Sequence, residues 1–173
     1  MFIIFIVKCT GGQTLHLIRI NDLKLSSKDV TVYPNHLLKQ SRPNYHLDPI
    51  VLEHYPKIKK LCIVNTVKEY LNRTDALRSS DEDKLLISTQ APHKGVAKST
   101  VARWVKSMLV KAGIDPSYTT HSTRAVATSL AKQKGVSMDR IAKTAGWSNA
   151  RTFHKYYKKP FQSSMSVQSA VLN

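Results

Sequence analysis

The chain carries, in this order, the segments His121-Ser122-Thr123-Arg124, Gly146-Trp147 and Tyr156-Tyr157. The offset of three residues places His121 and Arg124 together in the first turn of a helix that is predicted over residues 122–134. A helix N-terminus with a guanidinium and an imidazole suits a phosphate, because the backbone N–H groups, the helix dipole and the positive side chain all favour negative charge. The first segment alone is a weak signal, since His-x-x-Arg often occurs by chance.

The order and spacing of the three segments make the signal specific. Gly146-Trp147 follows the first segment by about two dozen residues, and the two tyrosines stand nine and ten residues beyond Trp147. This combination resembles the signature of the tyrosine recombinases, the phage-integrase family, over residues 10–161. The resemblance is closest to recombinase-like open reading frames of animal mobile elements. The alternative is that Trp147 is a packing anchor at a helix end and that the tyrosines are packing and surface residues.

The resemblance implies an enzyme that breaks and rejoins double-stranded DNA through a covalent 3′-phosphotyrosine link. It implies that Arg124 is the second arginine of the phosphate site, that His121 is the histidine beside it, and that Trp147 is the His/Trp hydrogen-bond donor. The spacing usual across the family favours Tyr156 as the nucleophile, whereas the mobile-element sequences favour Tyr157, so both stay candidates. The family uses neither a metal ion nor another cofactor.

Two further positions follow from the resemblance. The catalytic lysine of the family sits on a β-hairpin, and Lys39 holds the matching place, although an ordinary solvated lysine is the alternative. The first catalytic arginine normally precedes a Gln-Thr pair, but here Gly11 stands where that arginine is expected. Loss of one guanidinium costs about 2 to 4 kcal/mol of transition-state stabilisation. We therefore expect cleavage of DNA to be impaired.

The hydrophobic pattern predicts a mainly helical α+β domain with a small antiparallel β-hairpin. Strands are expected near residues 30–33, 50–52 and 85–88, with a basic turn between the first two that makes them a hairpin. Helices are expected near residues 13–25, 61–71, 99–109, 122–134, 137–145 and 152–157.

Length and composition indicate one domain over residues 1–161 and a polar C-terminal tail over residues 162–173. The apolar start at residues 1–7 is too short to span a membrane and is expected to belong to the core. A domain that begins inside an apolar stretch also suggests that an N-terminal portion lies upstream in full-length relatives. Two cysteines without metal-ligand spacing indicate a reduced, intracellular setting.

The charge points to nucleic acid as the partner. Lys and Arg number 27 against 11 Asp and Glu, which gives a formal charge of +16 and an isoelectric point near 10.0. Such a surplus binds polyanions, because each phosphate contact releases counterions. A non-catalytic DNA-binding remnant or a domesticated mobile-element protein is the second hypothesis, and a basic RNA-binding domain is the weakest. The resemblance also suggests a homo-oligomer on DNA and a nuclear location.

Overall fold

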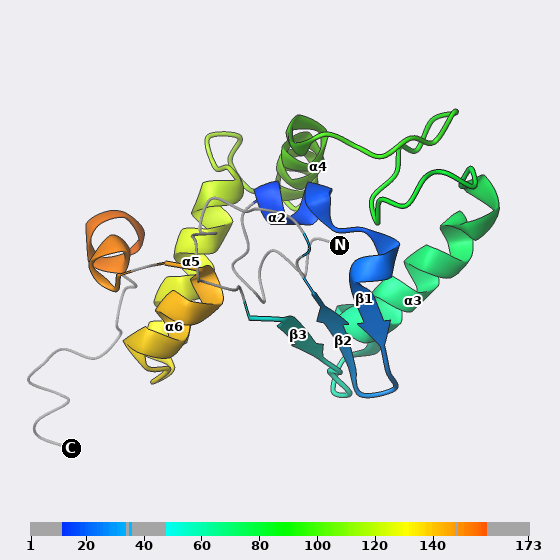
Figure 1. Cartoon of the computed structure of the whole chain (residues 1–173). Helices are drawn as coiled ribbons and strands as arrows, with labels where there is room; N and C mark the ends of the chain where they lie inside the picture. Colours follow the sequence, from blue (N-terminus) through cyan, green and yellow to red (C-terminus); the bar gives the residue numbers. More distant parts are fainter. Residues whose placement is uncertain (1–11, 34, 36–47, 148, 159–173) are drawn as a thin grey trace, which may run out of the picture.

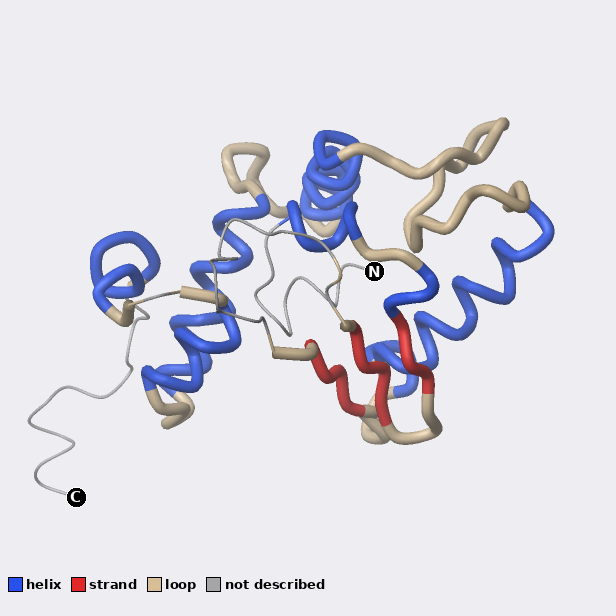
Figure 2. The backbone as a smooth tube through the Cα atoms, viewed as in Figure 1, coloured by secondary structure: helices blue, strands red, loops and turns tan. Residues whose placement is uncertain are grey.

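The structure is a computed structural model that describes residues 12–33, 35, 48–147 and 149–158. Its architecture is mainly helical, with one small sheet at the edge of the molecule (Figure 2). The elements before the sheet and within it are α2 (Gly12–Leu17), η1 (Ile20–Asp22), β1 (Leu23–Leu25), β2 (Asp29–Val32) and β3 (Ile50–Glu53). The later elements are η2 (Lys59–Leu61), α3 (Ile63–Thr74), η3 (Asp75–Leu77), α4 (Lys98–Lys111), α5 (Thr120–Gln133), α6 (Met138–Ala145) and η4 (Phe153–Tyr157).

The sheet has three antiparallel strands in the order β1-β2-β3. Leu23 pairs with Val32 in the first ladder, and Val30 pairs with Leu52 in the second. Alternation along β2 buries Val30 and Val32 on one face, as the period of two predicts. The predicted hairpin is therefore confirmed as β2 and β3, and β1 adds a strand that the pattern did not predict.

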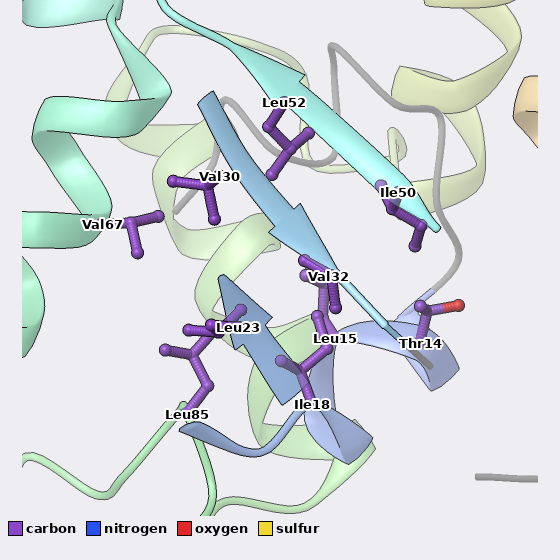
Figure 3. A pocket seen from close by; sticks show the side chains of 10 residues that line it. All are labelled: Thr14, Leu15, Ile18, Leu23, Val30, Val32, Ile50, Leu52, Val67 and Leu85. Atoms are coloured by element: carbon purple, nitrogen blue, oxygen red, sulfur yellow. The ribbon is translucent and has the colours of Figure 1, made fainter. Parts of the chain in front are cut away.

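Packing of α3 and α2 against the sheet forms the main hydrophobic core. Figure 3 shows apolar side chains from α2, the three strands and α3 converging on one small cavity, together with Leu85 from a loop. On the α3 side the core includes Val64, which is 1% exposed. The core continues along α4 through its buried residues, which are Val101, Val105 and Leu109.

The fold has two regions that differ in how they are packed. The sheet region comprises α2, the strands, α3 and α4, and the C-terminal region comprises α5, α6 and η4. Figure 1 shows α2 and α4 in the middle of the molecule, the sheet and α3 on one side, and α5, α6 and η4 on the other. Contacts of α4 with α5 join the two regions. An ion pair of 2.9 Å between Lys143 on α6 and Asp48, just before β3, spans them as well.

Three sequence expectations need correction. The helix predicted over residues 13–25 is only α2, because residues 23–25 pair with β2 instead of continuing the helix. Residues 85–87 are buried and Ser88 is half-buried, but residues 85–88 form no strand. The backbone N–H of Leu85 donates a hydrogen bond to the carbonyl of Ile18, and that of Ser88 donates one to the carbonyl of Lys94. The helix predicted from residue 99 begins at Lys98, with Ala97 in the capping position.

Candidate phosphate site

The start of α5 carries two of the predicted site residues, His121 and Arg124. Thr119 caps the helix, since its side chain accepts a hydrogen bond from the backbone N–H of His121, and the hydroxyl of Ser122 accepts one from the N–H of Thr119. The His121 side chain is exposed to solvent, and Arg124 is half-buried. Both residues lie near the start of α5, as expected, but Arg124 is the fifth residue of the helix and begins its second turn.

The end of α6 brings Trp147 back toward α5. Gly146 has a φ of 66°, the left-handed conformation that commonly ends a helix. The backbone N–H of Trp147 then donates a 2.8 Å hydrogen bond to the carbonyl of Ala142, which closes the turn. Because Gly146 reverses the chain at this point, Trp147 comes to lie against α5 rather than extending α6.

Arg124 links the two helices. Its guanidinium donates a hydrogen bond to the carbonyl oxygen of Ala145, in the last turn of α6. Carbonyls in the last turn have no partner within the helix, and the negative end of the helix dipole favours a cation there. This contact is a structural role for Arg124. A guanidinium has five N–H donors, so the same side chain can hold a carbonyl and a phosphate oxygen together.

Arg124, Trp147 and Tyr157 form one group, which we call the Arg-Trp-Tyr cluster. The guanidinium carbon lies 5.3 Å from the centroid of the Trp147 ring and 5.6 Å from that of Tyr157. The two rings are stacked, with centroids 4.6 Å apart and planes inclined by 28°. Both distances from the guanidinium lie within the range of cation–π attraction. Three residues separated by up to 33 positions in the sequence therefore converge on one place.

The two candidate nucleophiles differ sharply in their surroundings. Tyr157 is half-buried within the Arg-Trp-Tyr cluster. Tyr156 is 62% exposed, and its ring lies 5.1 Å from the Nζ atom of Lys155. The structure thus brings Tyr157, and not Tyr156, together with Arg124 and Trp147.

Two residues that hold the cluster together were not identified from the sequence. Phe153 is 2% exposed and anchors η4, with its ring centroid 6.2 Å from that of Trp147. Ser129 on α5 donates a 2.7 Å hydrogen bond to the carbonyl oxygen of Tyr157. Neither belongs to the three motif segments, and their roles depend on which elements meet in space.

The surroundings of the cluster are strongly basic. Between residues 113 and 158 the chain has eight Lys or Arg residues and two Asp residues, and no Glu. Several cations on α6, on η4 and next to η4 are exposed, namely Lys143, Arg151, Lys155 and Lys158. An excess of positive charge around a half-buried arginine favours an anionic ligand.

Two predicted positions, Lys39 and Gly11, lie outside the described residues. Within the described part of the chain, no group of three or more His, Cys, Asp or Glu residues is arranged to hold a metal ion. No helix of that part is both long and apolar enough to cross a membrane.

Comparison with solved structures identifies the fold as that of integrase-type recombinases. The crystal structure of XerA recombinase matches with a TM-score of 0.68 at 18% identity, over 92% of this chain and 50% of that one. XerH site-specific recombinase in a post-cleavage complex with its difH substrate matches at 0.66 and 15% identity, over 90% and 40%. A lambda integrase dimer bound to a core site matches at 0.56 and 14% identity, over 96% and 53%.

The chain belongs to the phage integrase family, the tyrosine recombinases, because the family model matches residues 14–163. The family recognised from the ordered motif is therefore confirmed, as is the mainly helical α+β fold. No curated protein sequence matches the chain significantly. The chain spans about half the length, or less, of the XerA and XerH recombinases that it resembles.

Proposed function

We propose that this domain binds double-stranded DNA and attacks a backbone phosphate with the hydroxyl of Tyr157. The observation that carries the proposal is the convergence of Arg124, Trp147 and Tyr157 in one basic region. Family membership supports the reaction class. Tyr157 is favoured over Tyr156 because its ring already lies beside the guanidinium that would hold the phosphate.

The chemistry follows from the residues at the site. The phenol oxygen attacks phosphorus and loses its proton; the bond from phosphorus to the 5′ oxygen breaks, and that oxygen takes up a proton. The products are a 3′-phosphotyrosine and a 5′ hydroxyl end, which can reverse the step and rejoin the strand. A phenol is a weak nucleophile near neutral pH, so fixed positive donors must stabilise the charge that develops on the phosphate.

Each site residue has a role in this scheme. Arg124 donates to the non-bridging phosphate oxygens, and the indole N–H of Trp147 donates to one of them. His121, at the N-terminus of α5, stabilises the same negative charge together with the helix dipole. Lys39 is proposed to donate a proton to the leaving 5′ oxygen. All four assignments come from matching the motif to the family.

Impaired cleavage is part of the proposal, because Gly11 stands where the family has its first catalytic arginine. The test is incubation with a suicide DNA substrate, whose cut end diffuses away and traps the covalent adduct. We expect little or no adduct from the native chain and at least a hundredfold more from Gly11→Arg, since one guanidinium contributes about 2 to 4 kcal/mol. Absence of any adduct from both chains would contradict the enzymatic proposal.

DNA binding without cleavage is the second candidate, and the formal charge of +16 together with Gly11 favours it. Binding that depends on phosphate contacts weakens steeply with salt, by roughly a thousandfold or more between 50 and 200 mM for six to ten contacts. Titration of labelled duplex DNA at several salt concentrations measures this slope. A flat response would remove this candidate.

Assembly and location are further parts of the proposal. Lambda integrase has been crystallised as a DNA-bound dimer and as a tetramer on a Holliday junction. We expect this chain to associate with copies of itself on DNA as well, which sedimentation with and without a duplex would detect. The resemblance to animal mobile elements favours a nuclear location, which imaging of the tagged chain in animal cells would test.

A further inference from the structure

Ser129 makes a hydrogen bond that is unusual for a serine within a helix. It lies on α5, five residues after Arg124, and is 4% exposed. Its hydroxyl donates to the carbonyl oxygen of Tyr157, 28 residues along the chain, at 2.7 Å. Serine and threonine inside helices commonly donate to a carbonyl one turn earlier in the same helix. The hydroxyl of Ser129 donates to a carbonyl of another element, η4.

The neighbouring residue provides the contrast. Thr128 is also buried on α5, at 1% exposed, and its hydroxyl donates to the carbonyl of Arg124 at 2.9 Å. This bond stays within the helix, as expected for a mid-helix threonine. The two adjacent hydroxyls are therefore alike in burial and helix position, but Thr128 donates within α5 and Ser129 donates to η4.

The hydrogen bond from Ser129 is made to the backbone of Tyr157, whose conformation sets the direction of the phenol ring. Tyr157 is the last residue of η4, and the next backbone N–H, that of Lys158, donates a 2.8 Å hydrogen bond to the carbonyl of Phe153. Phe153 is itself buried, so this second bond ties the turn to a fixed point. The backbone of η4 is thus held near Tyr157 by α5 and by its own first residue.

We propose that Ser129 is a positioning residue: its hydroxyl fixes the backbone of Tyr157 so that the phenol ring stays against Trp147 and Arg124. The catalytic consequence rests on the proposed function, in which Tyr157 is the attacking group. Reacting atoms must be held close to their productive geometry, and a displacement of about 1 Å can lower a rate by roughly a hundredfold. A single buried hydrogen bond at the backbone of the attacking residue provides such control.

The first test needs no catalytic activity. The chain has two tryptophans, so Trp104→Phe leaves Trp147 as the only one, and acrylamide quenching then measures how well its ring is covered. In this background Ser129→Ala is expected to raise the quenching constant, because Tyr157 no longer stays stacked on Trp147. Thr128→Val is the matched control: it also removes one buried hydroxyl from α5, and it should leave quenching unchanged.

The second test uses the chain, native or Gly11→Arg, that forms the covalent adduct on suicide DNA. Ser129→Ala is expected to lower the rate of adduct formation at saturating DNA about tenfold, the effect of roughly one lost hydrogen bond, with an unchanged dissociation constant for DNA. Thr128→Val should keep the rate. Loss of a residue that only stabilises the fold would not lower the rate of adduct formation while leaving the dissociation constant for DNA unchanged.

The outcomes separate this inference from the proposed function. Equal quenching in Ser129→Ala and Thr128→Val overturns the positioning role, and so does an unchanged adduct rate when quenching rises. If neither chain forms an adduct, the proposed function fails and the quenching result alone decides on Ser129. An adduct that persists in Tyr157→Phe removes Tyr157 as nucleophile but leaves the structural contact to be judged by quenching.

Discussion

The sheet region and the C-terminal region are held together by different kinds of contact. The sheet region buries branched aliphatic side chains, among them Leu52 and Val64, both 1% exposed. The buried residues of the C-terminal region are mostly small or polar, and they are Ala125, Thr128, Ser129, Ile141, Ala142, Ala145 and Phe153. Full burial of a large aliphatic side chain contributes about 1.5 to 3 kcal/mol, and an alanine contributes much less. The C-terminal region therefore depends more on specific hydrogen bonds and ring contacts.

Two half-buried arginines show what this difference means. In the sheet region, Arg78 donates to the carbonyls of Lys84 and Leu85 at 2.6 and 2.8 Å, and so fixes a loop. In the C-terminal region, Arg124 holds one carbonyl but also faces the rings of Trp147 and Tyr157. Arg78 is held by carbonyls, whereas Arg124 also faces two aromatic rings, where the proposed function places the phosphate and the attacking tyrosine.

The largest expected effect is on the rate of adduct formation, which Arg124→Ala should lower and Arg78→Ala should not. In the Gly11→Arg parent, we expect Arg124→Ala to lower adduct formation at least a hundredfold, because a donor to the developing charge is worth about 2 to 4 kcal/mol. Arg78→Ala should leave the rate of the folded protein within about twofold of the parent and act on stability, since buried carbonyls lose their charged donor. Single-turnover rates and denaturant unfolding of both variants measure the two quantities. Similar kinetic losses in both variants would abolish the distinction.

A core substitution should act on the sheet region as a whole. Leu52→Ala is expected to lower the free energy of unfolding by about 2 to 5 kcal/mol, because it leaves a cavity in a closely packed core. Urea unfolding monitored by circular dichroism gives the value. A loss below about 1 kcal/mol would mean that the sheet packs less tightly against α3 than the buried fractions indicate.

A smaller effect is expected at the start of α5. Thr119→Ala removes the hydroxyl that accepts a hydrogen bond from the backbone N–H of His121. Loss of such a cap lowers the free energy of unfolding by about 1 kcal/mol. Since Arg124 directly follows the first turn, adduct formation by the Gly11→Arg parent should fall together with stability. Thr119→Ser retains the cap and should behave as the parent in both assays. A Ser variant as impaired as the Ala variant would show that the cap is not responsible.

The smallest effect is expected for the ion pair between the two regions. The side chains of Lys143 and Asp48 are 73% and 63% exposed, so the pair is well solvated. Such pairs contribute about 0.2 to 1 kcal/mol, and salt screens them. A double-mutant cycle with Lys143→Gln and Asp48→Asn, at low and high salt, measures the coupling. A coupling well above 1 kcal/mol that is insensitive to salt would mean that the regions are joined more firmly than proposed.

Local signals allowed the C-terminal region to be predicted well. The helix expected near residues 137–145 is α6, which Ser137 caps and Gly146 ends; caps and left-handed glycines act through their immediate neighbours, so such a helix can be predicted from the local sequence. The sheet region was predicted less well. Leu15, Ile18 and Leu25 have near-helical spacing, yet residues 23–25 form β1, since pairing with β2 overrides a local preference.

The choice between Tyr156 and Tyr157 could not be made from the sequence. Adjacent residues of a helix point in directions about 100° apart, so only one of the two can face α5. The register is decided by the π-helical turn of η4, where the N–H of Lys158 reaches the carbonyl of Phe153, and by the bond from Ser129. Neither the turn type nor a contact with a residue 28 positions away can be predicted from the local sequence pattern.

The most direct test of the Arg-Trp-Tyr cluster is to identify the tyrosine that becomes linked to DNA. The adduct trapped with Gly11→Arg is digested with protease and nuclease, and the modified peptide is sequenced by mass spectrometry. We predict that the phosphate is on Tyr157, that Tyr157→Phe forms no adduct, and that Tyr156→Phe forms it at nearly the parent rate. A phosphate on Tyr156, with Tyr157→Phe still active, would contradict the account.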